Sequence, residues 1–231
     1  MSNLSQMPVS MKGFFLNTEQ RCPVTLILDT SGSMHGGKID QLNTGLQAFL
    51  TAVRADALAA KRVELAIVTF GGAVETVQAF NTVDKIMPPS LDAEGDTPMG
   101  AAIEEAFRIT AERQALYRQA GISSYQPWYV TITDGEPTDD IAKASALVSQ
   151  AEKAKKGAFY AIGVDGADMN VLKAISSRPP LDLDGINFTA LFQWLSVSLG
   201  VHSRSPGSST PQLPQELGKP AANARKRGVG R

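Results

Sequence analysis

The stretch that decides the fold is "VTLILDTSGSMHGGKID", residues 24–40, in which an apolar run ends in an acid. A continuous apolar run of this kind predicts a strand that is buried on both faces. Hydroxyl-bearing residues and glycines follow Asp29, and apolar residues then recur at helical spacing from Ile39 to Val53. The pattern therefore predicts a strand, a polar loop and a helix, and the chemistry to be explained lies in the loop.

The same alternation continues along the chain. Further strands are predicted at "VELAIVTF" (63–70), "AVETVQAF" (73–80), "WYVTITD" (128–134) and "AFYAIGV" (158–164), and helices from Pro98 onward and over about 139–156, 168–177 and 189–201. The two glycines between 63–70 and 73–80 are too few for a parallel crossover, so this pair is expected to form a hairpin. We therefore expect an α/β fold with a doubly wound, mostly parallel sheet, one antiparallel edge strand and helices on both faces.

The bulk composition narrows the class of protein. The chain has 231 residues, of which 43% are apolar, and a single cysteine, Cys22, which excludes an internal disulfide framework. The first 21 residues contain no apolar core of signal-peptide length, and no segment approaches the roughly 18 apolar residues that span a bilayer. We expect a cytoplasmic protein that does not enter the membrane.

The charge distribution divides the chain into three parts. Residues 201–231 carry six Lys or Arg and one Glu, whereas the rest of the chain is net acidic. We expect an N-terminal arm at 1–20, one domain at 21–202, and a basic Ser/Pro-rich tail at 203–231 that is disordered because it has few large apolar residues to bury. A short basic run is weak evidence for nucleic-acid binding, which we do not expect.

Three polar segments are expected at one rim of the sheet. Asp29, Ser31 and Ser33 are spaced by two, which places their side chains on one side of an extended segment. Thr97 in "EGDTPMG" precedes a helix, and Asp134 in "TDGEP" ends a strand. The carboxyl ends of parallel strands share one rim, where binding sites form. Carboxylate and hydroxyl oxygens suit a hard cation such as Mg²⁺, so these five residues are candidate metal ligands.

Two enzymatic readings compete for the same loop. "GSMHGGK" (32–38) fits the first seven positions of a phosphate-binding P-loop, but the eighth position, which needs a hydroxyl, is Ile39. A phosphotransferase of the haloacid-dehalogenase type would use Asp29 as nucleophile. That chemistry needs an acid at position 31, where this chain has Ser, and a lysine that 98–142 lacks.

The three segments together resemble the metal-ion-dependent adhesion site of von Willebrand factor A domains. "DTSGS" matches the D-x-S-x-S motif, and the Thr of "GDTPMG" and the Asp of "TDGEP" follow in the same order. The resemblance extends over about residues 22–201. More narrowly, three segments look like the bacterial tellurium-resistance TerY group: "RCPVTLILDTSGSM", "IDQLNTGLQAFL" and "LDGINFTALFQWLSVSLGVHSRS".

The resemblance implies a site, a cofactor and a partner. Mg²⁺ or Mn²⁺ would be bound by Ser31, Ser33 and Thr97, with Asp29 and Asp134 acting directly or through water. An Asp or Glu of another protein would complete the coordination, and the protein would not be an enzyme. Membership of the TerY-like group implies a role in tellurite or chemical-stress resistance beside a kinase and a phosphatase. A magnesium-dependent hydrolase of nucleotides or phosphate esters using Lys38 or Asp29, and a passive adaptor that binds through its tail, stay open as alternatives.

Overall fold

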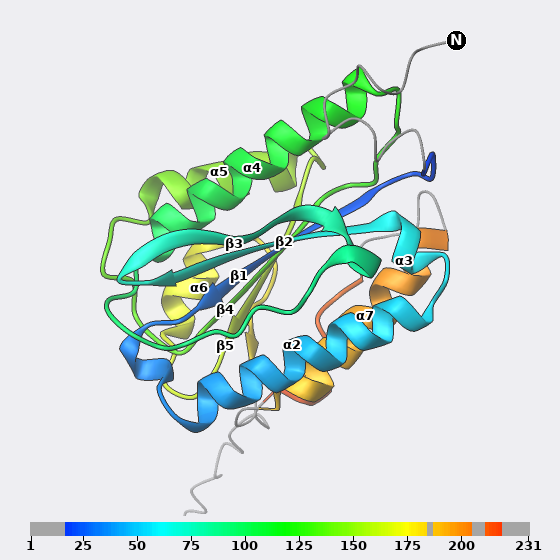
Figure 1. Cartoon of the computed structure of the whole chain (residues 1–231). Coiled ribbons are helices and arrows are strands. Elements are labelled where there is room, and N and C mark those ends of the chain that lie inside the picture. The colour runs from blue at the N-terminus through cyan, green and yellow to red at the C-terminus, as the bar shows by residue number, and fades with distance from the viewer. Residues whose placement is uncertain (1–16, 184–186, 205–210, 219–231) are drawn as a thin grey trace, which may run out of the picture.

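The fold is built on one six-stranded sheet. The computed structural model describes residues 17–183, 187–204 and 211–218, and Figure 1 shows helices on both sides of the sheet. The strand order is β3-β2-β1-β4-β5-β6. The strands are β1 (Cys22–Asp29), β2 (Val63–Gly71), β3 (Ala73–Thr82), β4 (Trp128–Thr133), β5 (Ala158–Gly163) and β6 (Leu181–Asp182).

The central strands are parallel and the predicted hairpin forms the antiparallel edge. β1 lies between β2 and β4, and both pairings are parallel, as are β4 with β5 and β5 with β6. β2 and β3 pair antiparallel, with register irregularities between Leu65 and Val68. Every residue of β1, β4 and β5 is buried, as a two-sided apolar run requires. The predicted fold class is confirmed.

Two helical layers cover the sheet. One contains α2 (Gly37–Ala55), α3 (Ala59–Arg62) and α7 (Phe188–Arg204), and the other α4 (Met99–Gln119), α5 (Ala142–Lys153) and α6 (Met169–Ile175). The 3-10 turns are η2 (Gly32–Met34), η3 (Val83–Lys85) and η4 (Gln215–Leu217). Alternate β1 residues enter separate cores, since Leu26 and Leu28 pack with the α2 layer and Ile27 with the α4 layer. None of the helices within the described ranges is long and apolar enough to cross a membrane.

Part of the predicted tail contacts the domain. α7 continues through Ser203 to Arg204, and residues 211–218 return to the domain, where Leu213 is buried and Gly218 bridges to Leu183. The Tyr160 hydroxyl donates to the Pro211 carbonyl at 2.8 Å. These residues thus contact the domain within the segment where the sequence predicts a disordered tail, and Leu213 supplies an apolar anchor there. The rest of the tail, and most of the arm at 1–20, lie outside the described residues.

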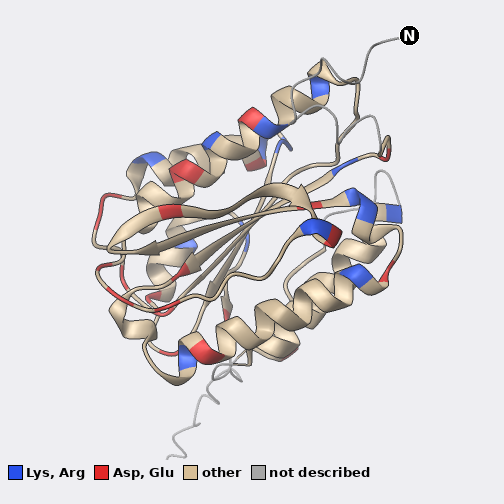
Figure 2. Cartoon of the chain, in the orientation of Figure 1, with Lys and Arg blue, Asp and Glu red and all other residues tan. Residues whose placement is uncertain are grey.

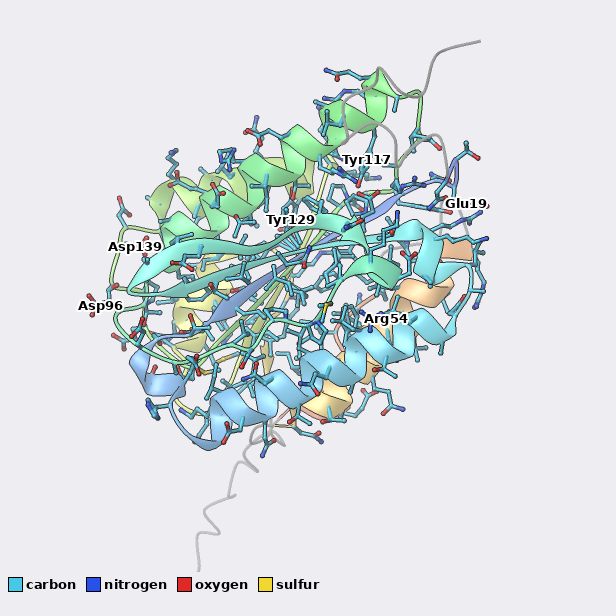
Figure 3. The ribbon with its side chains drawn as sticks, viewed as in Figure 1. Glu19, Arg54, Asp96, Tyr117, Tyr129 and Asp139 are labelled. Carbon is cyan, nitrogen blue, oxygen red and sulfur yellow. The ribbon has the colours of Figure 1, made fainter. Side chains whose placement is uncertain are left out.

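A buried ionic network stands at the end of the sheet opposite the rim of Asp29. Glu64 at the start of β2 is 1% exposed and accepts from Arg21 at 2.9 Å, from Arg113 at 2.6 Å and from the Tyr117 hydroxyl at 2.7 Å. Burial and the Glu64 charge hold the pKa of Tyr117 well above its usual value. Figure 3 places Tyr117 far from Asp139, a residue of the opposite rim.

Glu64→Gln is expected to lower the free energy of unfolding by about 3 kcal/mol, because it removes the negative charge that faces the buried Arg21 guanidinium and the partly buried Arg113 guanidinium. Urea unfolding followed by circular dichroism measures this. Glu112→Gln is the matched control, since Glu112 pairs with Arg108 on the exposed face of α4, and its unfolding midpoint should not move. Equal midpoints for both variants would contradict the assigned role of Glu64.

His202 on α7 makes the fold sensitive to acid. It is 5% exposed, its ring centroid lies 5.0 Å from those of Tyr125 and Trp128, and neither ring nitrogen has a hydrogen-bond partner in the described structure. Burial lowers its pKa below the ordinary 6.5. The unfolded chain thus takes up a proton that the folded chain excludes.

Stability should therefore fall as pH drops through 6.5, by at most about 1.4 kcal/mol per pH unit from this group. His202→Phe should flatten that part of the profile. Urea unfolding of both proteins at intervals between pH 7.5 and 5.5 gives the two slopes. Parallel slopes would mean that other groups cause the acid sensitivity.

Candidate metal centre

Asp29 is the buried anchor of the candidate site. It ends β1 with 0% exposure, and its Oδ1 accepts the backbone N–H of Ser31 at 2.8 Å. The register that pairs Leu28 with Ile132 puts Thr133 beside it, and the Thr133 hydroxyl donates to Asp29 Oδ2 at 2.5 Å. Burial raises the pKa of Asp29, and the charge of Asp134 raises it further, against the hydrogen bonds from Ser31 and Thr133.

The hydroxyls of Ser31 and Ser33 lie between the carboxylates of Asp29 and Asp134. Ser31 is 1% exposed, and its Oγ lies 3.0 Å from the Oγ of the exposed Ser33. Ser33 donates to Asp134 Oδ1 at 2.6 Å, across 101 positions of sequence. Asp134, just after β4, is 4% exposed. The structure thus brings together four of the five predicted ligands through contacts and hydrogen bonds.

Thr97 reaches the same place from the loop before α4. A Cβ built on Gly135 would lie 3.4 Å from Thr97 Oγ1 and 3.6 Å from Ser33 Oγ, so both hydroxyls flank Gly135. The Thr97 backbone exchanges hydrogen bonds with Thr138: its N–H donates to the Thr138 hydroxyl at 3.2 Å and its carbonyl accepts at 3.0 Å. All five predicted side chains therefore meet at one rim.

Backbone hydrogen bonds join the loops that carry these residues. The Thr30 N–H donates to the Phe70 carbonyl and the Glu94 N–H to the Thr30 carbonyl, at 3.0 and 2.8 Å. Gly71 permits this approach, because a Cβ there would lie 2.2 Å from the Thr30 carbonyl oxygen. The Gly32 N–H donates to the Gly95 carbonyl at 2.9 Å. Main-chain hydrogen bonds therefore hold these loops together.

Lys38 is the residue that the alternative P-loop interpretation would place on a phosphate. Its Nζ lies 2.5 Å from Asp134 Oδ2 and 3.2 Å from the Asp165 carbonyl, while Ile39 is buried. The ammonium thus supplies positive charge to Asp134. The residues 32–38 form η2 and the start of α2, and the lysine points along the rim to the second acid.

The donor set fits a small hard cation. It consists of oxygen atoms alone, from two nearly buried carboxylates and three hydroxyls, which suits Mg²⁺ or Mn²⁺. A cation would offset the cost of keeping the Asp29 carboxylate charged in the interior. Within the described ranges no three His, Cys, Asp or Glu side chains gather as a metal cluster. Any cation at this rim therefore depends on the serine and threonine hydroxyls.

The contacts of three supporting residues were not predicted from the sequence. Thr133 and Lys38 contact the two acids, and Asp139 caps α4, accepting from the Gly100 and Ala101 N–H groups at 2.9 and 2.8 Å. The sequence predicts that the next helix starts near Asp139. In the structure α5 begins at Ala142, and the Asp139 carboxylate accepts hydrogen bonds from the start of α4 instead. The strand register and the loop paths create these contacts, and no local motif signals them.

Comparison with known proteins identifies the family of the domain. The von Willebrand factor type A domain model matches residues 24–190. Matrilin-3 from Mus musculus is 25% identical over 166 residues, which is 68% of this chain and 32% of matrilin-3. The chain thus spans about a third of the length of that relative.

Solved structures share the fold at low sequence identity. The pilus adhesin SpaC from Lactobacillus rhamnosus GG, in its open conformation, is 15% identical, with a TM-score of 0.59 over 80% of this chain and 31% of SpaC. The vWF domain of the type V pili tip protein Mfa5 from Porphyromonas gingivalis is 11% identical, with a TM-score of 0.56 over 83% of this chain and 99% of that domain. At these identities the similarity concerns the fold alone.

Asp139→Ala should destabilise the domain by about 1 kcal/mol, because two N–H groups at the start of α4 lose their acceptor. Asp139→Asn keeps one oxygen acceptor and should lose roughly half as much. Urea unfolding midpoints compare the two variants with the parent protein. An unchanged midpoint in Asp139→Ala would show that solvent replaces the cap.

Proposed function

Because the chain belongs to the von Willebrand factor type A domain family, we propose that its rim binds Mg²⁺ or Mn²⁺ and recognises a partner protein. The observation that carries this proposal is the convergence of Ser31, Ser33 and Thr97 on the acids Asp29 and Asp134. The partner offers an Asp or Glu to the bound ion. The protein acts by recognition and does not turn over a substrate.

The balance of charges supports this reading. Three of the five proposed ligands are neutral, so the protein supplies two negative charges, and the Lys38 ammonium already faces one of them. A divalent ion held there keeps net positive charge, which attracts a carboxylate from outside. Asp29 anchors the loop, Ser31 and Ser33 present hydroxyls, and Asp134 links the loop to β4.

The hydrolase alternative lacks a specific observation in its favour. Lys38 is engaged by Asp134, and the buried Ile39 cannot ligate magnesium. An assay of phosphate release from ATP in magnesium is nevertheless a simple companion experiment. Release that disappears in Lys38→Ala would favour the hydrolase over recognition.

We further propose that the protein takes part in tellurite or chemical-stress resistance in the bacterial cytoplasm. This proposal rests on the likeness of residues 21–34, 39–50 and 183–205 to the TerY group. A kinase or a phosphatase is then the expected partner. Capture of such a protein through the metal site would support this role, and capture of unrelated proteins alone would contradict it.

The binding experiment combines a metal titration with a partner capture. Calorimetry with Mn²⁺ and Mg²⁺ should show one site in the parent protein and loss of measurable binding in Ser31→Ala/Ser33→Ala. A pull-down with the same proteins should retain a partner in magnesium and release it in chelator, because the ion bridges the two proteins.

Ser145→Ala/Ser149→Ala on α5 is the matched control, since it removes two hydroxyls away from the rim, and it should behave like the parent. Circular dichroism establishes that each variant is folded. A partner held equally with and without metal would overturn the proposal and direct attention to the tail.

A further inference from the structure

A cavity of about 350 Å³ lies directly beside the candidate metal centre. The hairpin of β2 and β3 forms one side, with Thr69 and Glu75, and residues 90–95 form the other. Thr69 and Glu75 are direct partners in the antiparallel ladder, so their side chains share one face of the sheet. Thr69 stands two positions after Ile67, which packs in the α2 core, so that face is the one toward α2.

The cavity is acidic and has no counter-charge. Glu75, Asp92 and Glu94 line it, and its lining contains no Lys or Arg. All three are exposed, and none of their carboxylates makes a hydrogen bond or ion pair with any residue that the structure describes. Figure 2 shows acidic residues gathered on the loops at this end of the molecule. The three charges are therefore free to act on a ligand.

Two nearly buried threonine residues add a second, independent observation. Thr30 and Thr69 line the cavity and are 7% and 6% exposed. Among the described residues, neither hydroxyl has a hydrogen-bond partner, and neither is among the fully buried unpaired polar atoms, so both hydroxyls are accessible from the cavity. A ligand that brings several N–H donors into the cavity would satisfy these hydroxyls and the carboxylates together.

The lining also selects for the shape of the ligand. Val77, Leu91 and Ala73 give the cavity an apolar part beside its acids. A side chain with a methylene stem and a cationic head fits both parts, because the stem packs on apolar surface while the head meets the carboxylates. A bare metal ion would leave the apolar part unused. The lining offers three carboxylates and two hydroxyls as acceptors. The five N–H donors of an arginine match this set better than the three donors of a lysine.

The cavity and the metal centre share a wall. Thr30 lines the cavity and stands between Asp29 and Ser31, so its Cα is about 3.8 Å from those of both ligands. Gly95, also in the lining, lies two residues before Thr97. Side chains two positions apart in an extended segment are separated by about 6.5–7 Å. One short segment of a partner can therefore reach both places.

We propose that this acidic cavity is a second recognition subsite that takes an arginine side chain. That the arginine and the metal-binding carboxylate belong to the same partner rests on the proposed function. The selectivity of the cavity for a guanidinium group does not, because it follows from the charges and hydroxyls of the lining.

The test is an NMR titration of the full chain with Nα-acetyl-arginine methylamide, performed in chelator. The amide signals of Thr30, Thr69, Gly72 and Gly95 should shift, with an apparent Kd on the order of millimolar for so small a ligand. Nα-acetyl-citrulline methylamide, which has the same shape without the charge, should shift them at least about tenfold less at equal concentration.

Glu75→Gln/Glu94→Gln should raise the apparent Kd at least about fivefold, since it removes two of the three attracting charges. Asp84→Asn/Glu112→Gln removes two acids that lie outside the lining and should leave the Kd unchanged. The spectra themselves report whether each variant is folded. Equal shifts by the arginine and citrulline probes, or shifts unchanged in Glu75→Gln/Glu94→Gln, would overturn the proposal.

The two proposals fail separately in this design. Cavity shifts in chelator, together with no Mn²⁺ binding by calorimetry, would support the subsite and overturn the metal centre. Normal Mn²⁺ binding with no cavity shifts would overturn the subsite and leave the metal centre standing. With both sites intact, a peptide that carries Arg and Asp two residues apart should bind at least about tenfold tighter in magnesium than its Asp→Asn form.

Discussion

The rim of this molecule depends on one buried charge, the carboxylate of Asp29 at the end of β1. A carboxylate with no exposed surface has to be hydrogen-bonded, and its two oxygens are engaged by the Ser31 N–H and the Thr133 hydroxyl. The first bond sets the turn that follows β1, and the second ties this turn to β4. Ser33 then meets Asp134 as a consequence of the same turn.

Main-chain hydrogen bonds extend this constraint to the neighbouring loops. The Thr30 N–H and carbonyl bind Phe70 and Glu94, and the Gly72 N–H donates to the Asp96 carbonyl at 2.9 Å. Loops bonded in this way lose little freedom when a ligand arrives, which reduces the entropic cost of binding. Asp139 adds a side-chain cap at the start of α4, and Figure 3 shows it at the same end of the molecule as Asp96. The rim is thus organised before any partner approaches.

The sequence predicted the fold and the proposed ligands because both leave local patterns. Two-sided apolar runs such as 24–29 and 128–134 indicate buried parallel strands, and the short connection at 71–72 indicates the hairpin. The supporting contacts leave no such pattern. Thr133 reaches Asp29 across 104 positions and Lys38 reaches Asp134 across 96, and each contact depends on strand register. The return of 211–218 was likewise hidden, since it depends on few apolar residues such as Leu213.

The charges at the rim differ between the two sides of the first loop, and this difference determines how a partner can bind. Lys38 stands beside Asp134 on one side of the first loop, whereas Glu75, Asp92 and Glu94 surround the cavity on the other. Under the proposed function, a cation at the hydroxyl cluster makes the first side attract acids while the second attracts bases. A partner that carries only one kind of charge is repelled by one of the two sides, so discrimination comes from repulsion as much as from attraction. The single turn after β1, with Thr30 facing the cavity and Ser31 in the metal centre, keeps both sides at a fixed separation.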